Sequence, residues 1–158
     1  MNYFELFEIP VSIKNDRSFL SKKYAELQRK YHPDFYTQLS EEEQQQALEI
    51  SSSINKALKV LQNEDATIKY ILQLKNILEE EEKYKLSPDF LMEMMELNEE
   101  EPESRKLKAE TYTEGLYNEI KPLIENYNDG LATEEQLLRL KAYYYQKKYL
   151  QRILDRTE

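Results

Sequence analysis

The sequence holds one histidine, His32, and it stands beside a carboxylate in the tripeptide His32-Pro33-Asp34. A histidine paired with an aspartate can serve as a general base and its orienting partner. These two residues flank a proline in an expected tight loop, however, and the sequence has no cysteine and no evident nucleophile elbow. We therefore expect no catalytic residue. The tripeptide is interpreted as a contact site for a partner or, more simply, as a helix stop followed by a solvated loop.

Two helical segments flank the tripeptide and would present it at the tip of a hairpin. Asp16 can cap the first segment, whose apolar residues recur at the spacing of a helix with one buried face. Pro33 disfavours helical geometry at His32, so this helix should end there. Ser40 and Glu43 form a capping box that begins the next helix.

Charge is unevenly distributed along the chain. The segment 17–31 has five basic residues against one acidic residue, and four of the basic residues lie opposite the apolar stripe: Lys22, Lys23, Arg29 and Lys30. The segment 79–103 has eleven acidic residues against two lysines and so carries the whole net charge of −9. The two segments suggest two separate partner surfaces. The net charge argues against nonspecific binding of nucleic acid.

The composition favours an all-α protein. Of 158 residues only two are glycine and five are proline, and good helix formers dominate. The absence of cysteine excludes disulfides and thiolate-ligated metal centres within these residues, and we expect no cofactor or metal. No apolar run approaches the length of a membrane span, so we expect no membrane partner. Residues 1–10 lack the basic region of a targeting peptide.

Helix start signals divide the chain into two helical units. We expect a first unit at 1–76, a linker at 77–87 that contains four adjacent glutamates, and a three-helix bundle at 88–158. Pro88, Pro102 and Thr133 mark the starts of the three bundle helices. Pro122 lies inside the second of these helices and should kink or break it.

The first bundle helix is rich in methionine and glutamate. Phe90, Met94 and Leu97 form a narrow stripe that can face the bundle. Beyond that stripe the helix carries more apolar residues with glutamates beside them: Leu91, Met92, Met95, Glu96 and Glu99. A wide buried face is one interpretation, because methionine fills irregular core gaps. We favour an exposed apolar strip that binds a partner, because buried glutamates would be costly.

The N-terminal unit resembles the J domain of DnaJ-type co-chaperones. The resemblance rests on Tyr3–Phe7, on Tyr24 and Leu27–Tyr31, on the tripeptide, and on Ile54–Leu61. It implies binding to a DnaK-type chaperone ATPase and stimulation of its ATP hydrolysis through His32, Pro33 and Asp34 and through the four basic residues named above. Phe35 departs from the family, in which many members have lysine at this position.

With its bundle, the whole chain resembles the HscB family of J-domain co-chaperones of iron–sulfur cluster assembly. The bundle pattern at 90–97, the segment Ile68–Leu72 and the pair Tyr149-Leu150 carry this likeness. It implies delivery of an IscU-type scaffold protein to a DnaK- or HscA-type chaperone. The matching scaffold-binding residues are Leu91, Met92, Met95, Glu96, Glu99, Glu103 and Tyr149. For Tyr149, ordinary helix packing is an equally good interpretation.

Several alternatives stay open at the level of sequence. The chain could be a J-domain co-chaperone with a different client, its bundle serving client binding or oligomerisation. A generic helical interaction module and a small hydrolytic enzyme using His32 are further alternatives. The sequence lacks the cysteine-rich N-terminal module of some eukaryotic members, which favours a bacterial, cytoplasmic form. Spare apolar residues on the last two helices leave both a monomer and a weak dimer open.

Overall fold

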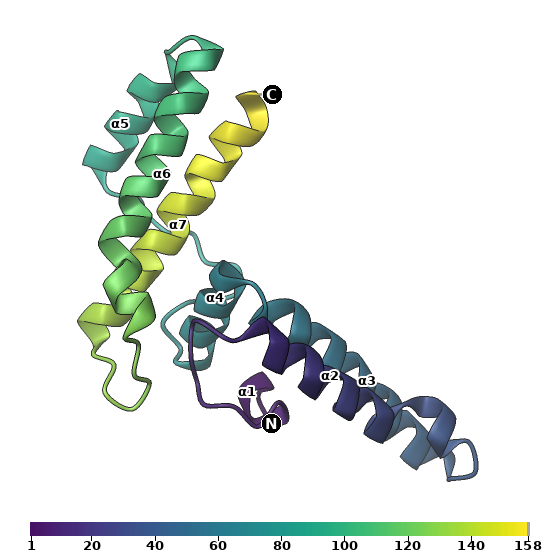
Figure 1. Ribbon diagram of the computed structural model, residues 1–158. Helices are drawn as coiled ribbons and strands as arrows, with labels where there is room; N and C mark the ends of the chain where they lie inside the picture. Colours follow the sequence, from purple (N-terminus) through teal and green to yellow (C-terminus); the bar gives the residue numbers. More distant parts are fainter. Residues whose placement is uncertain (158) are drawn as a thin grey trace. The chain divides into compact units, whose positions relative to one another are not determined.

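The computed structural model describes residues 1–157, and within them the chain is helical without a β-strand (Figure 1). In chain order the elements are α1 (Tyr3–Leu6), α2 (Arg17–Tyr31), the 3₁₀ helix η1 (Pro33–Tyr36), α3 (Glu41–Leu61), α4 (Glu64–Leu74), α5 (Pro88–Asn98), α6 (Pro102–Glu125) and α7 (Glu134–Thr157). The predicted all-α class is confirmed. None of these helices has both the length and the apolar character that crossing a bilayer requires.

The chain forms two compact units, Met1–Tyr70 and Ile71–Glu158, and the division between them falls within α4. In the first unit, α2 and α3 lie side by side as a hairpin, and α1 packs against α3. The apolar stripe of α2 buries Leu20 and Leu27, and α3 buries Ile54. The hairpin tip therefore stands at the end of two helices that are fixed to each other by an apolar seam.

Side-chain caps set the ends of these helices at the predicted residues. The backbone N–H groups of Ser18 and Phe19 donate to the Asp16 carboxylate at the start of α2. The N–H of Glu43 donates to the Ser40 hydroxyl at the start of α3, at 3.2 Å. Such caps satisfy donors that a helix N-terminus leaves without a partner. Both predicted helix starts are confirmed.

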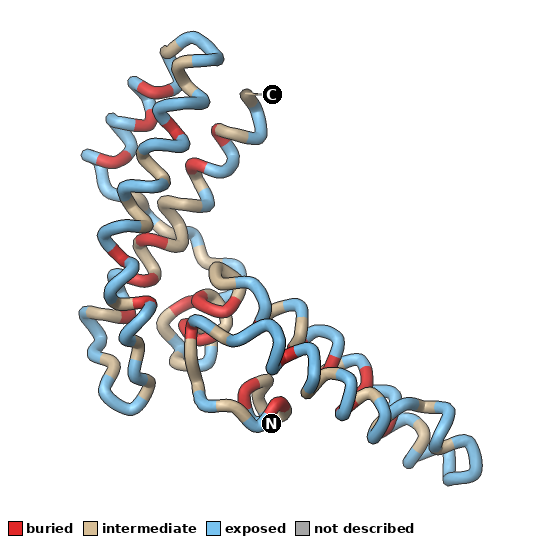
Figure 2. Tube along the Cα trace, viewed as in Figure 1, coloured by how far each residue is buried: buried red, intermediate tan, exposed pale blue. Residues whose placement is uncertain are grey.

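In the second unit, α5, α6 and α7 share one apolar core. Phe90 and Met94 of α5, Ala109 of α6, and Leu150 and Ile153 of α7 are buried together. Figure 2 shows the buried positions of the three helices on the sides that face one another. Burial of these apolar side chains is the main force that assembles the bundle.

The segment 77–87, predicted as a linker, is not helical but is packed on α7. Lys141 of α7 donates from Nζ to the Ile77 carbonyl at 2.7 Å and pairs with the Glu82 carboxylate, also at 2.7 Å. The ring of Tyr84 stacks on that of Tyr145, with their centroids 4.4 Å apart. These contacts tie the segment to the second unit. The division into J domain, linker and bundle stays a prediction.

Of the kink or break predicted at Pro122, the break is wrong, because α6 continues to Glu125. Pro122 lies in the last turn of the helix, where its missing N–H removes a hydrogen bond close to the end of the ladder. The backbone N–H of Asn126 donates to the Pro122 carbonyl at 3.0 Å, and its side-chain amide donates there as well, at 2.9 Å. The helix end is therefore stabilised just beyond the proline.

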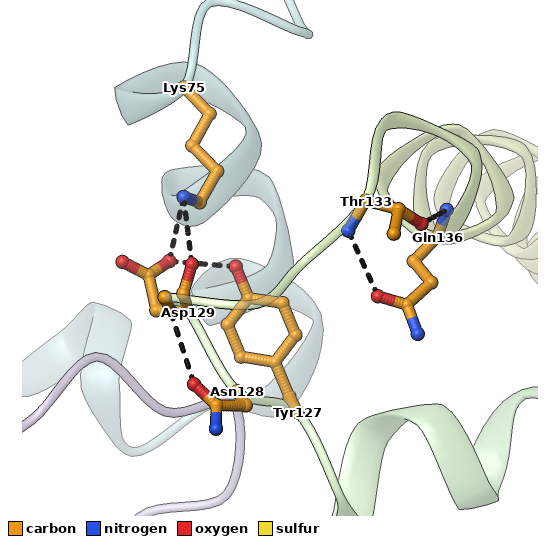
Figure 3. Close-up of polar contacts among 7 residues, drawn as sticks. Lys75, Tyr127, Asn128, Asp129, Thr133 and Gln136 are labelled. Atoms are coloured by element: carbon orange, nitrogen blue, oxygen red, sulfur yellow. Dashed lines mark hydrogen bonds and ion pairs between the residues drawn. The ribbon is translucent and has the colours of Figure 1, made fainter.

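The turn between α6 and α7 is held by polar contacts (Figure 3). The Tyr127 hydroxyl donates to the Asp129 carboxylate at 2.8 Å, and Lys75 Nζ pairs with the same carboxylate at 2.9 Å. Thr133 and Gln136 exchange reciprocal hydrogen bonds at 3.0 and 3.1 Å. This is the capping box that the sequence predicts for the start of α7.

Candidate partner-binding sites

His32 ends α2 and begins η1, as the proline at position 33 requires. Its backbone is extended, with φ of −62° and ψ of 131°. The N–H of Asp34 donates to His32 Nδ1 at 3.2 Å, and the same nitrogen lies 3.5 Å from the Asp34 carboxylate. The side chain of His32 is 48% exposed and that of Asp34 is 83% exposed. The tripeptide thus displays both groups to solvent in a locally fixed arrangement.

The residues that follow the tripeptide hold and extend the tip. The Tyr36 hydroxyl donates to the Lys30 carbonyl at 2.7 Å and so ties η1 to the last turn of α2. Phe35 lies edge-on to the His32 ring, with the centroids 6.0 Å apart, and is itself 67% exposed. The tip therefore presents an aromatic surface at the position where many J domains carry lysine.

The four predicted basic residues of α2 are not equivalent. Lys22, Arg29 and Lys30 are exposed. Lys23 is only 17% exposed at its side chain and pairs with Glu8 at 3.2 Å and more distantly with Glu26. The charge of Lys23 is thus largely compensated within the unit, and the other three cations form the accessible basic face.

The structure separates the apolar residues of α5 into two sets. Phe90, Met94 and Leu97 are buried in the bundle core. Leu91, Met92 and Met95 are exposed, Met92 at 62% and Met95 at 64%. We call these last three residues the apolar strip. The expectation of an exposed strip is confirmed against that of a wide buried face, while its role in binding stays a prediction.

Glu96 of α5 and Glu99 at its C-terminal end border the apolar strip, Glu103 lies in the first turn of α6, and the remaining predicted site residue lies on α7. Glu96, Glu99 and Glu103 are exposed. Tyr149 is partly buried, and its ring meets that of Phe90 edge-on with the centroids 5.9 Å apart. Tyr149 therefore packs where α5 meets α7 and still reaches the surface, which agrees with both interpretations of this residue.

A groove of about 280 Å³ lies between α5 and α6 beside this border. The Tyr112 hydroxyl donates to the Glu93 carboxylate, and Lys108 pairs with Glu100 across the groove. Burial and the hydrogen bond to Glu93 raise the pKa of Tyr112 to about 12, so this hydroxyl stays a donor at neutral pH. Sequence reasoning missed Glu93 and Tyr112 as a pair, because they come from different helices and no single-helix spacing links them.

Across residues 1–157, no group of three or more histidine, cysteine, aspartate or glutamate side chains is placed to hold a metal ion. The tip offers an imidazole, a carboxylate and nearby cations. The strip offers flexible apolar groups with a carboxylate border.

Comparisons with known proteins give a consistent result. The family model of the HSCB C-terminal oligomerisation domain matches residues 86–158. A co-chaperone protein HscB homolog of Vibrio cholerae is 30% identical over 98% of this chain and 98% of its own length. A homolog of the same name from Vibrio parahaemolyticus is 34% identical and covers 85% of this chain and 84% of its own.

Two solved structures share the fold along nearly the whole chain. The structure of chaperone HscB from Vibrio cholerae aligns with a TM-score of 0.64 at 28% identity and covers 100% of both chains. The crystal structure of human co-chaperone protein HscB aligns with a TM-score of 0.74 at 25% identity and covers 99% of this chain and 82% of the human one. The likeness thus includes both compact units.

Proposed function

Because the chain belongs to the HscB family of co-chaperones, we propose that it stimulates ATP hydrolysis by a DnaK- or HscA-type chaperone and delivers an IscU-type scaffold protein to it. In this proposal the protein assists iron–sulfur cluster transfer and protein maturation in the bacterial cytoplasm. The observation that carries it is that one chain exposes both a His32–Asp34 tip and an apolar strip, each on its own compact unit.

The tip and the basic face would bind the chaperone. Lys22, Arg29 and Lys30 are exposed and can steer encounter with an acidic surface and fix the orientation of the hairpin. His32 and Asp34 would then contact the ATPase from a loop whose geometry is set before binding. Such preorganisation reduces the entropy lost when the complex forms.

The apolar strip would bind the scaffold protein. Leu91, Met92 and Met95 lie exposed on α5, and removing them from water would favour association. Methionine side chains adapt to the shape of a partner. Glu96, Glu99 and Glu103 would favour a partner with basic groups around an apolar centre.

Having both surfaces on one chain would bring the bound scaffold protein near the chaperone at high effective concentration. Hydrolysis takes place in the chaperone and would trap the scaffold there. In this proposal the protein makes and breaks no covalent bond. It binds the scaffold protein, orients it toward the chaperone and then releases it. It acts as a monomer or a weak dimer and needs no cofactor.

The test is steady-state ATP hydrolysis by the purified chaperone, measured with this protein, with the scaffold protein, and with both. We expect the two additions together to stimulate more than the sum of each alone. Stimulation that is indifferent to the scaffold protein would keep the J-domain role and assign the bundle to a different client or to oligomerisation. No stimulation at all would reduce the tripeptide to a helix stop and overturn the proposal.

A further inference from the structure

A stripe of aromatic and basic residues on α7 lies outside the bundle core and outside the predicted site, except for Tyr149. The residues are Lys141, Tyr145, Lys148, Tyr149 and Arg152, spaced so that they share one face of the helix. Tyr84 of the segment 77–87 lies over this face and stacks on Tyr145, with the rings 10° from parallel. Between them is a recess of about 170 Å³, lined in part by Lys148, Tyr149 and Arg152.

The recess is electropositive in a chain of net charge −9. Glu82 is the acidic residue in its described lining, and Lys141 compensates it through an ion pair at 2.7 Å. Lys148 rests over the ring of Tyr144 at 5.9 Å from the centroid. Arg152 is exposed and forms no hydrogen bond or ion pair within residues 1–157. Two cations thus remain available to an incoming anion.

The tyrosines of the recess add neutral hydrogen-bond donors. Burial raises the pKa of Tyr145, and the nearby charge of Glu82 raises it further, so its hydroxyl stays protonated. Neither this hydroxyl nor that of Tyr84 is engaged in a hydrogen bond inside the described part of the chain. A guanidinium fork together with hydroxyl donors matches the acceptor geometry of a carboxylate.

Tyr149 connects the recess to the predicted scaffold surface. It lines the recess on one side and meets Phe90 of α5 edge-on on the other. Phe90 directly precedes the apolar strip on the same helix. Tyr149 is itself one of the predicted scaffold-binding residues, so a partner in contact with Tyr149 lies directly beside the other residues of the recess.

We propose that this recess takes an aspartate or glutamate side chain of the IscU-type scaffold protein, as a second part of the scaffold-binding surface. The inference rests on the proposed function and adds a second contact, in which the charges of the two partners are reversed. The border of the strip is acidic and would meet basic groups of the scaffold, whereas the recess is basic and would meet an acid. Two contacts of opposite charge fix the orientation of a partner that an apolar strip alone would leave variable.

The experiment compares Arg152→Glu with Arg139→Glu in isothermal titration of the purified scaffold protein without nucleotide. Arg139 is a matched control, because it is exposed on the same helix and does not line the recess. We expect R152E to weaken binding about tenfold, as for loss of a close charge pair, and R139E to change it by less than about twofold. The difference in scaffold affinity between R152E and the unsubstituted protein should become smaller as the salt concentration is raised, because salt screens charge pairs.

Each outcome decides between the two proposals. If the unsubstituted protein does not bind the scaffold at all, the proposed function fails. If it binds and R152E matches R139E, the recess is not a scaffold contact and only this inference is overturned. If R152E instead changes sedimentation of the protein alone and leaves scaffold binding intact, the recess takes a second copy of the chain, and the inference is again overturned. Arg152→Gln, which removes the charge without reversing it, repeats the comparison should R152E fold poorly.

Discussion

The tip of the α2–α3 hairpin and the apolar strip of α5 are both exposed, but they acquire their geometry in different ways. The tip is set by neighbours in sequence, through the bond from Asp34 N–H to His32 and the bond from Tyr36 to Lys30. The strip alternates along its helix with residues of the bundle core, such as Met94. A change at the tip therefore affects one local loop, whereas a change on α5 affects either binding or folding according to which side of the helix it falls on.

The largest expected effect is at the tip. We predict that His32→Gln reduces stimulation of the chaperone to the rate of the chaperone alone, because it removes the imidazole that the loop presents. Steady-state ATP hydrolysis with and without the variant measures this change. Affinity for the scaffold protein should stay the same, because His32 belongs to the first compact unit and α5 to the second.

The control for this variant is a measurement of its thermal unfolding. His32 is half-exposed and contributes nothing to the apolar core, so His32→Gln should leave the melting temperature nearly unchanged. Full stimulation by a folded His32→Gln protein would contradict the assignment of the tip and leave the tripeptide with the role of a helix stop.

On α5 the comparison can be made within one helix, because substituting exposed methionines should affect scaffold binding, whereas substituting a buried one should affect stability. We predict that Met92→Ala with Met95→Ala weakens scaffold binding roughly tenfold or more, if each exposed side chain contributes about 1 kcal/mol to the contact. The free energy of unfolding should change little, because Met92 and Met95 are 62% and 64% exposed. Titration calorimetry and urea unfolding measure the two effects.

Met94→Ala is the matched variant on the buried side of the same helix. Met94 is fully buried, and its truncation should lower the free energy of unfolding by about 2–5 kcal/mol through lost burial and a residual cavity. Its scaffold affinity, measured where the variant is folded, should stay close to that of the unsubstituted protein. If the double variant of the exposed methionines binds normally, the strip is not the scaffold surface.

The same difference, between contacts made by neighbours in sequence and contacts made by tertiary packing, explains which features the sequence could predict. The caps at Asp16, Ser40 and Thr133 were predictable, because each depends on a side chain and an N–H two or three residues away. The exposure of Met92 and Met95 was predictable from helical spacing together with the intervening glutamates.

Features that join distant residues could not be predicted in this way. Lys23 was grouped with the exposed cations, but its pairing with Glu8 depends on how the loop before α2 folds back. The recess on α7 needs Tyr84 to stack on Tyr145, sixty-one positions later in the chain. Spacing along a single helix carries no information on such contacts, which arise from tertiary packing.

The smallest expected effect concerns the ion pair between Lys141 and Glu82, which ties the segment 77–87 to α7. The hydrogen bond from Lys141 holds the pKa of Glu82 below its usual value of 4.5. The folded state therefore favours the ionised carboxylate, and the resulting stability is present above pH 4.5 and is lost as the pH falls through the lower, folded-state pKa.

We predict that Glu82→Gln lowers the free energy of unfolding at neutral pH by no more than about 1 kcal/mol, and that the difference disappears in acid. Urea unfolding at both pH values measures it, with Asp34→Asn, whose carboxylate is 83% exposed, as the control expected to show no loss. A Glu82→Gln deficit that is equal at neutral and acid pH would mean that this segment is held by the Tyr84–Tyr145 stack and the Ile77 carbonyl rather than by charge.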